Sequence, residues 1–153
     1  MKKYSQIPPI LISRSISYWL QGRVHFPKDQ LGAVLVEQEQ FAVFRKMILR
    51  PSGSEQASPG AIFKVYFRFA RFSKKINRIL SLIPIPLILA QPGFRSKTWL
   101  FGKDTDTFQG LYEWNSVEDA EHYWNSLPLR LMKKRAVPDS LRYEITAAEK
   151  THT

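Results

Sequence analysis

The side chains that most often carry catalysis or bind metal ions are sparse in this 153-residue chain. It contains no cysteine, which excludes disulfides, thiolate nucleophiles and cysteine-based zinc sites. Its three histidines, His25, His122 and His152, stand far apart and lack the short spacing of a helical metal pair. The sequence also shows no nucleophile triad, phosphate-binding loop or paired-carboxylate motif. We therefore predict no metal site and leave the catalytic residues unassigned.

Positive charge is the most uneven property of the sequence. The formal net charge is +10, and no Asp or Glu occurs from residue 56 to residue 103. The basic residues of that stretch are Lys64, Arg68, Arg71, Lys74, Lys75, Arg78, Arg95, Lys97 and Lys103, and a second cluster comprises Arg130, Lys133, Lys134 and Arg135. Such fields attract polyanions, anionic lipid surfaces and anionic small molecules. The alternative is that the basic character only keeps the protein soluble.

The most apolar stretch, residues 76–94, follows directly on this charge. Its uninterrupted part, 79–90, is shorter than the roughly 20 residues that a transmembrane helix needs, and Pro84 and Pro86 break a regular helix. We expect a lid over a folded core, with peripheral membrane contact as the alternative. The N-terminus begins like a signal peptide, but Pro8, Pro9 and Arg14 interrupt its apolar part, so we predict a structural role, with a signal anchor as the alternative. The absence of cysteine is compatible with the cytoplasmic location that we expect.

Hydrophobic periodicity predicts one domain with an N-terminal extension. We assign residues 1–50 to an extension containing a β-hairpin that turns near Gln38, 51–60 to a loop rich in Pro, Ser and Gly, 61–146 to the core, and 147–153 to a tail. Within the extension a helix is the alternative to the hairpin. The expected core elements are a strand over 61–70, a helix over 73–83, strands over 95–102 and 107–114, a helix over 116–127 that Pro128 interrupts, and a strand over 140–146.

The order of these core elements predicts an α+β fold. Strand, helix, strand, strand, helix, strand is the ferredoxin-like βαββαβ plan, with an antiparallel four-stranded sheet covered on one face by two helices. Because apolar sheet faces rarely stay uncovered, the N-terminal hairpin, a second subunit, or both should pack on the other face.

Three segments carry a family resemblance: "PGFRSKTWLF", "FQGLYEWNSVEDAEHYW" and "VPDSLRYEI". In these the chain resembles the antibiotic-biosynthesis-monooxygenase-like members of the dimeric α/β-barrel superfamily, over about residues 61–146. The resemblance implies a homodimer whose two sheets form a barrel, with a pocket in each subunit between sheet and helices. Members include cofactor-independent monooxygenases that act on electron-rich aromatic substrates, haem-degrading enzymes, and small proteins of unassigned role.

The residues that the haem-degrading branch uses are not matched here. That branch has an Asn on the first strand, a Trp on the second helix and a His after that helix. The strand 61–70 has no Asn, Tyr123 lies near the Trp position beside Trp124, and Lys133 lies near the His position. Because a protonated Lys cannot replace a neutral imidazole as an axial ligand, we predict no cofactor and argue against haem.

A cofactor-free oxygenase of this type needs a pocket for an electron-rich ring and a group that exchanges protons. The candidate pocket residues are Arg68, Trp99, Tyr112, Trp114, His122, Tyr123 and Trp124, with Tyr66 as a further polar contact. The alternative for the aromatic residues is simple core packing, and for His122 a solvated surface position.

We therefore predict a homodimeric binding protein for a small hydrophobic, aromatic or anionic molecule, with monooxygenase-like activity as its catalytic form. The alternative is a non-enzymatic structural or binding protein whose basic surface contacts an anionic membrane. RNA binding is the least favoured alternative: the element order matches the RNA-recognition motif, but the strand 107–114 lacks its aromatic and basic pattern.

Overall fold

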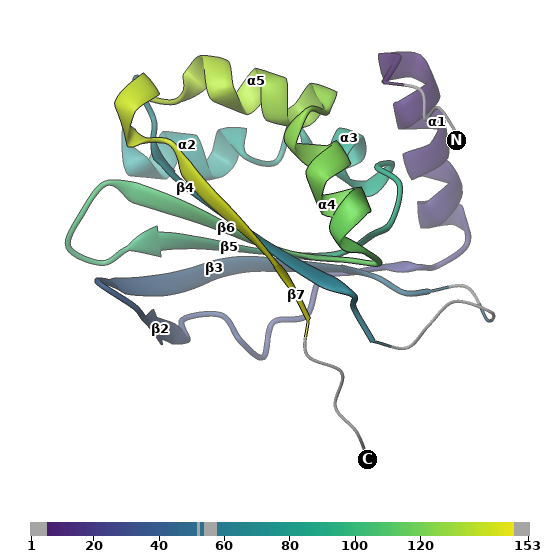
Figure 1. Cartoon of the computed structure of the whole chain (residues 1–153), viewed down its shortest axis with the longest axis horizontal. Helices are drawn as coiled ribbons and strands as arrows, with labels where there is room; N and C mark the ends of the chain where they lie inside the picture. Colours follow the sequence, from purple (N-terminus) through teal and green to yellow (C-terminus); the bar gives the residue numbers. More distant parts are fainter. Residues whose placement is uncertain (1–5, 52, 54–57, 149–153) are drawn as a thin grey trace.

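The computed structural model describes residues 6–51, 53 and 58–148, and its elements form a helical layer on one face of a single sheet (Figure 1). The expected tail beyond residue 148, His152, the start of the chain and part of the loop 51–60 lie outside the described residues. The helices are α1 (Pro8–Leu20), α2 (Lys74–Leu80), α3 (Ile85–Leu89), α4 (Val117–Trp124) and α5 (Leu127–Arg135), with a 3₁₀ turn at Pro138–Ser140. The strands are β1 (Val24–His25), β2 (Val34–Val36), β3 (Gln40–Leu49), β4 (Ala61–Arg68), β5 (Phe94–Gly102), β6 (Thr107–Trp114) and β7 (Arg142–Ala147).

The seven strands form one sheet in which every described pair is antiparallel. The order is β1-β3-β5-β6-β4-β7, and β2 pairs with β3 outside this path. The segment β5-β6-β4-β7 is the ferredoxin-like sheet that the sequence predicts. The predicted N-terminal hairpin is also present, since β2 and β3 join through a turn in which the Glu37 N–H donates to the Glu39 carbonyl. Strand β3 of this hairpin widens the sheet by pairing with β5. Strand β2 pairs with β3 and lies on the side of the sheet away from the helices (Figure 1).

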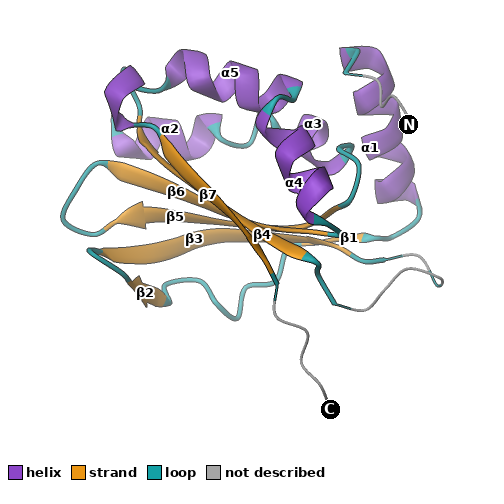
Figure 2. Cartoon of the chain, viewed as in Figure 1, coloured by secondary structure: helices purple, strands orange, loops and turns teal. Residues whose placement is uncertain are grey.

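All five helices lie on the same face of the sheet (Figure 2). The expected caps form: Ser73 accepts a hydrogen bond from the Ile76 N–H, and Ser116 accepts one from the Asp119 N–H. Two helices differ from expectation. Prolines that we interpreted as interruptions occupy the first turns of α1 and α5, where the missing N–H costs no hydrogen bond.

The apolar stretch behind the basic cluster forms part of this helical layer. It divides into α2 and α3 at Pro84, and the three buried residues of α3 are Ile85, Ile88 and Leu89. Other apolar side chains of the segment are solvent-exposed, including Ile79 at 57% and Ile83 at 72%. None of the helices in the described part of the chain is both long enough and apolar enough to cross a bilayer.

The sheet separates two hydrophobic clusters. The larger one lies under the helices and includes Phe63, Tyr112, Trp114 and Tyr123, whereas the smaller one, on the hairpin side, is built from Phe41, Val43, Tyr66 and Leu100. Strand β3 contributes side chains to both clusters because it contains a bulge. Val43 pairs with Leu100 and Arg45 with Trp99, so Phe44 has no partner residue in β5 and the side chains after it change face. Beyond the bulge, β3 therefore packs its Met47 and Leu49 in the larger cluster.

Candidate functional site

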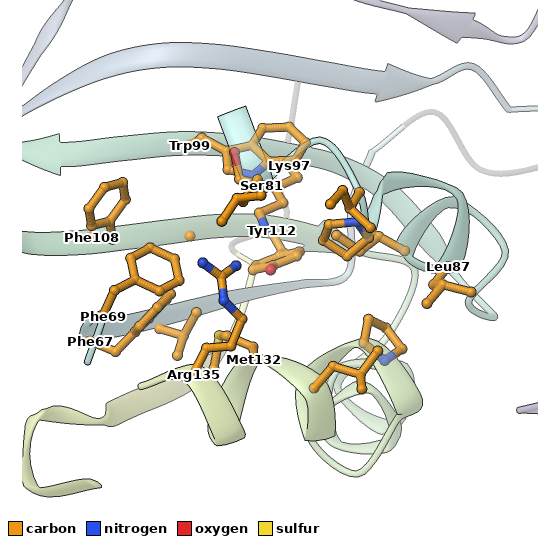
Figure 3. Close-up of a pocket in the computed structure, with 18 of the residues that line it drawn as sticks. Phe67, Phe69, Ser81, Leu87, Lys97, Trp99, Phe108, Tyr112, Met132 and Arg135 are labelled. Atoms are coloured by element: carbon orange, nitrogen blue, oxygen red, sulfur yellow. The ribbon is translucent and has the colours of Figure 1, made fainter. Parts of the chain in front are cut away.

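A cavity of about 470 Å³ lies between the helical side of the sheet and the segments α2, α3 and α5 (Figure 3). This volume is typical of a small-molecule site. Most of its wall is apolar, and the strand residues that line it include Val65, Phe67, Trp99, Phe108 and Tyr112. The helices contribute Leu87, Ile88, Leu131 and Met132. The cavity therefore suits a ligand with a large hydrophobic surface.

Lys97 is the most unusual side chain in the wall of this cavity. It comes from β5, on the same side of the strand as Trp99, and is only 9% exposed. Its ammonium nitrogen lies 4.5 Å from the centre of the Trp99 ring and 4.6 Å from that of Tyr112. Among the described residues, no hydrogen bond or ion pair to an acceptor accompanies these ring contacts. A buried cation held only by aromatic faces is poorly compensated for its lost hydration.

Burial lowers the pKa of Lys97 to about 7, and the positive charge of Arg45 adds to the effect. Near neutral pH both the neutral amine and the ammonium form of Lys97 are therefore populated. A neutral amine can accept a proton, and the protonated form can pair with an anion. Lys97 can thus accept a proton from a ligand, or pair with an anionic ligand, within the physiological pH range.

Arg45 is itself fixed in place. Its Nη1 donates to Ser81 Oγ at 2.7 Å, and its Nη2 donates to the carbonyl of Arg78 at 3.1 Å. The guanidinium also lies over the Trp99 ring, 5.1 Å from the ring centre. These contacts tie β3 to the end of α2 and hold a permanent positive charge near Lys97.

Two tyrosines form a polar pair at the side of the cavity. Tyr123 Oη donates to Tyr112 Oη at 3.0 Å, and both side chains are buried. Burial raises the pKa of both phenols above their usual value, so each stays protonated at neutral pH. These hydroxyls can offer hydrogen bonds to a ligand, but they are not proton acceptors.

Basic side chains also lie at the end of the cavity formed by α5. Lys134 is exposed and Arg135 half-buried, and both line the cavity. The Arg135 guanidinium donates to Asn77 Oδ1 at 2.6 Å and lies 4.6 Å from the centre of the Phe69 ring. In Figure 3 it points toward the space between Phe69 and Tyr112. An acidic group on a ligand would therefore meet cations at two places, Lys97 and this end.

The structure separates the candidate residues into two groups. Trp99, Tyr112 and Tyr123 line the cavity, and their role in binding stays a prediction. The other candidates do not line it: Trp114 is fully buried in the core, Trp124 stacks on Tyr143 with ring centres 3.7 Å apart, Arg68 is exposed at the end of β4, and His122 is half-buried on α4. Tyr66 lies on the opposite face of the sheet, in the hairpin-side cluster.

The sequence interpretation missed Lys97, Arg135 and Met132 as wall residues. Lys97 was counted among surface charges, although it alternates with Trp99 in a strand and therefore shares its face. That parity was the available signal. Arg135 and Met132 were not recoverable in the same way, because the helix α5 that carries them was not predicted.

No family model matches this sequence, and no curated protein matches it. Two solved structures from Listeria monocytogenes share its fold. An uncharacterised ferredoxin-fold protein related to antibiotic biosynthesis monooxygenases aligns with a TM-score of 0.53 and 14% identity, covering 84% of this chain and 93% of the other. A haem-degrading enzyme aligns with a TM-score of 0.51 and 14% identity, covering 80% and 95%. The predicted ferredoxin-like fold is thus confirmed.

The prediction of no cofactor, with haem argued against, is corrected by this second structure. The fold that this chain shares is one that serves a haem-degrading enzyme. The sequence argument also used the wrong side chain: Lys133 does not line the cavity, because its Nζ donates to the Trp124 carbonyl at 2.9 Å.

The cavity itself fits a haem in its wall chemistry. A macrocycle could pack between the aromatic and aliphatic walls, and Lys134 and Arg135 could pair with its carboxylates. The Lys97 amine, when neutral, and the Met132 thioether are two donors in the wall that could meet an iron. A bound haem would supply an iron that binds and activates dioxygen.

Proposed function

We propose that this protein binds a flat, hydrophobic molecule with an acidic group in the cavity between its sheet and helices. The observation that carries the proposal is Lys97, a cation buried in an aromatic wall without an anionic partner among the described residues. A ligand carboxylate or phenolate would supply the missing charge. The aromatic rings would pack on the hydrophobic part of the same ligand.

We further propose that the catalytic form of this function is monooxygenase-like, with Lys97 as the proton acceptor for a substrate whose acidic group pairs with Lys134 and Arg135 instead. The neutral amine would take a proton from an activated C–H of an electron-rich aromatic substrate, leaving a carbanion that dioxygen can oxidise. One oxygen atom would enter the product as a ketone and the other would leave as water, so that R₂CH₂ and O₂ give R₂C=O and H₂O. The buried wall supports this role because it lowers the pKa of the amine to about 7, so that the neutral form is available near neutral pH.

We also propose that the protein is a homodimer that pairs through the hairpin side of its sheet. On that side Val34 is 44% and Val36 68% exposed, and a cavity of about 380 Å³ lies between the hairpin and the sheet. Such apolar exposure on a sheet face favours a partner. The mass in solution, measured by light scattering, tests this: a monomer at micromolar concentration would contradict it.

Binding can be tested with two probes of the same shape. Fluorescence titration should show that 9-anthracenecarboxylate binds the wild-type protein more tightly than the uncharged 9-methylanthracene. The substitution Lys97→Met should weaken carboxylate binding about tenfold at pH 6.5, where Lys97 is mostly charged, and leave the uncharged probe unaffected. The matched control is Lys103→Met, which removes an exposed lysine outside the cavity wall. Equal effects of the two substitutions, or no binding of either probe, would contradict the proposal.

Haemin provides a separate titration in the same experiment. If haem occupies the cavity with Lys97 at the iron, its absorption spectrum should change on binding and should differ between wild type and Lys97→Met. An identical spectrum in both proteins would exclude Lys97 as the iron ligand.

A further inference from the structure

The cavity reaches the surface through a ring of apolar and basic side chains. Ile83, Leu131 and Lys134 line the cavity and are also solvent-exposed, so they mark its mouth. Ile83 belongs to the segment between α2 and α3, whereas Leu131 and Lys134 belong to α5. The mouth therefore opens between these two parts of the helical layer.

Further exposed apolar side chains lie on α2 and on the segments next to it, which flank this mouth. We name the mouth and its surroundings the rim surface; its exposed apolar residues are Phe72, Ile76, Ile79, Leu82, Ile83 and Leu131, each between 41% and 72% exposed. Phe72 has a φ of 71°, a conformation that bulky residues rarely adopt, and its ring is 64% exposed. This many large apolar side chains in contact with water favours a partner that can take them up.

The charge of the rim surface is of one sign. Its exposed cations are Arg71, Lys75, Arg130 and Lys134, and neither α2, α3 nor α5 contains an Asp or Glu. Acidic residues flank these elements: Asp104 and Asp106 lie on the β5–β6 turn, which Lys74 ties to α2 by donating to the Thr105 carbonyl, and Asp139 follows four residues after the end of α5. The partner should therefore be anionic as well as apolar.

We propose that the rim surface docks on an anionic lipid bilayer. A bilayer meets both requirements: its headgroups pair with the cations, while its acyl boundary accepts side chains such as Ile79 and Leu82. RNA would use the charge but would gain nothing from exposed aliphatic side chains. A second copy of the same surface would repel the first because both carry positive charge.

Docking in this orientation turns the mouth of the cavity toward the lipid. If the cavity binds a hydrophobic anion as proposed above, that ligand can pass between bilayer and cavity without crossing water. The ligand class would then be a lipophilic acid dissolved in the membrane. This second step rests on the proposed binding function, whereas the docking itself does not.

Co-sedimentation with vesicles tests the docking. The wild-type protein should sediment with vesicles of equal parts phosphatidylglycerol and phosphatidylcholine and should stay in solution with phosphatidylcholine alone. Lys75→Glu should lower the partition coefficient by about 25-fold, since each charge removed near an anionic surface is worth about fivefold and the reversal counts twice. Ile79→Glu should lower it at least tenfold, because it removes an inserted side chain and adds repulsion.

The matched control is Leu20→Glu, which places the same charge at an exposed apolar position at the end of α1, outside both the rim surface and the proposed dimer face. It should sediment like wild type, and thermal unfolding should show that all variants fold. Wild type that stays in solution with the anionic vesicles, or equal losses for Leu20→Glu and Ile79→Glu, would overturn the proposal. So would Ile79→Glu that sediments like wild type while added RNA displaces it, because that result identifies a site for polyanions.

The two proposals fail separately. Neither Lys75 nor Ile79 lines the cavity, so binding of 9-anthracenecarboxylate in vesicle-free solution should be unchanged in both variants. Loss of sedimentation with intact probe binding supports docking, whereas probe binding without sedimentation in wild type leaves only the cavity function standing.

Discussion

The two faces of this sheet differ in whether their ionised side chains have partners within the chain. On the helical side, Lys97 is buried among aromatic rings without a described acidic partner. On the hairpin side, Glu37 accepts hydrogen bonds from Tyr66 Oη at 2.6 Å and from Lys64 Nζ at 3.2 Å, and Gln109 lies within 3.4 Å of the same Tyr66 hydroxyl. On the hairpin side, the chain itself supplies the hydrogen bonds of Glu37. On the helical side, we propose that a ligand supplies the partner of Lys97.

This difference separates a structural polar network from a candidate site. An ionised group with a full set of partners fixes the structure around it, and the half-buried Glu37 holds the hairpin against the sheet in this manner. A buried ionised group without them costs stability, which a protein retains where function requires it. Measuring how side chains on each face change the free energy of unfolding tests this contrast.

The largest effect should come from removing one phenylalanine from each face. Phe63 is fully buried and its ring contacts those of Tyr112, Tyr123 and Trp124, whereas Phe41 is equally buried but has one described ring contact, to Tyr66. Phe63→Ala should lower the free energy of unfolding by about 4 kcal/mol and Phe41→Ala by about 3 kcal/mol, since the hairpin can collapse around its cavity. Urea titration measures both losses. A larger loss for Phe41→Ala would reverse the assignment of the main core.

The next effect concerns the charge of Lys97. Its pKa is about 7 in the folded protein against 10.5 when unfolded, so the unfolded chain binds more protons between these values and stability rises with pH across them. Below pH 7 both states are protonated and the full cost of burial is present. Lys97→Met should therefore stabilise the protein by about 3 kcal/mol at pH 6, and by less as the pH rises toward 10.

Urea titration from pH 6 to pH 10 checks this prediction, with Lys103→Met as the control that should show no such trend. A loss of stability in Lys97→Met at pH 6 would mean that the charge of Lys97 is satisfied within the chain. The contrast between the two faces would then be wrong.

The smallest effect is expected on the hairpin side. Burial raises the pKa of Glu37, but the hydrogen bonds from Tyr66 and Lys64 outweigh it and hold the pKa below its usual 4.5. The resulting stability is present above pH 4.5 and is lost as the pH falls through the lower folded value. Tyr66→Phe should cost about 1.5 kcal/mol at pH 7 and less at a pH below the folded pKa of Glu37, where the carboxyl is protonated.

Thermal unfolding at the two pH values measures this loss. Tyr143→Phe serves as control, because Tyr143 is exposed and keeps its ring stacking on Trp124 without the hydroxyl. A cost for Tyr66→Phe that does not change with pH would show that Glu37 is not its essential partner.

The sequence predicted the core fold because alternation and capping act locally. The pattern of 107–114 gave the bounds of β6, and Ser116 gave the start of α4, since a strand face and an N-cap are set by near neighbours. Helices α1 and α5 were missed for one physical reason: a proline was interpreted as a break, although at a first turn it begins a helix.

The site was less predictable than the fold. Trp99, Tyr112 and Tyr123 could be chosen as wall residues from their elements, but Trp114 and Trp124 could not be distinguished from them, because strand and helix faces do not reveal where a cavity opens. Lys97 needed only its strand parity, yet its lowered pKa depends on the packing of Trp99 and Tyr112 around it and on Arg45 from β3. Neither dependence is local in sequence.

Because of the bulge at Phe44, strand β3 contributes side chains to both faces of the sheet. Phe41 and Val43 lie in the cluster that the hairpin covers, and Arg45, just past the bulge, carries the charge that acts on Lys97. Two regions on opposite faces of the sheet are therefore joined through a few covalent bonds of one strand. Without the extra residue at Phe44, strict alternation along β3 would place Arg45 on the hairpin side of the sheet, away from Lys97.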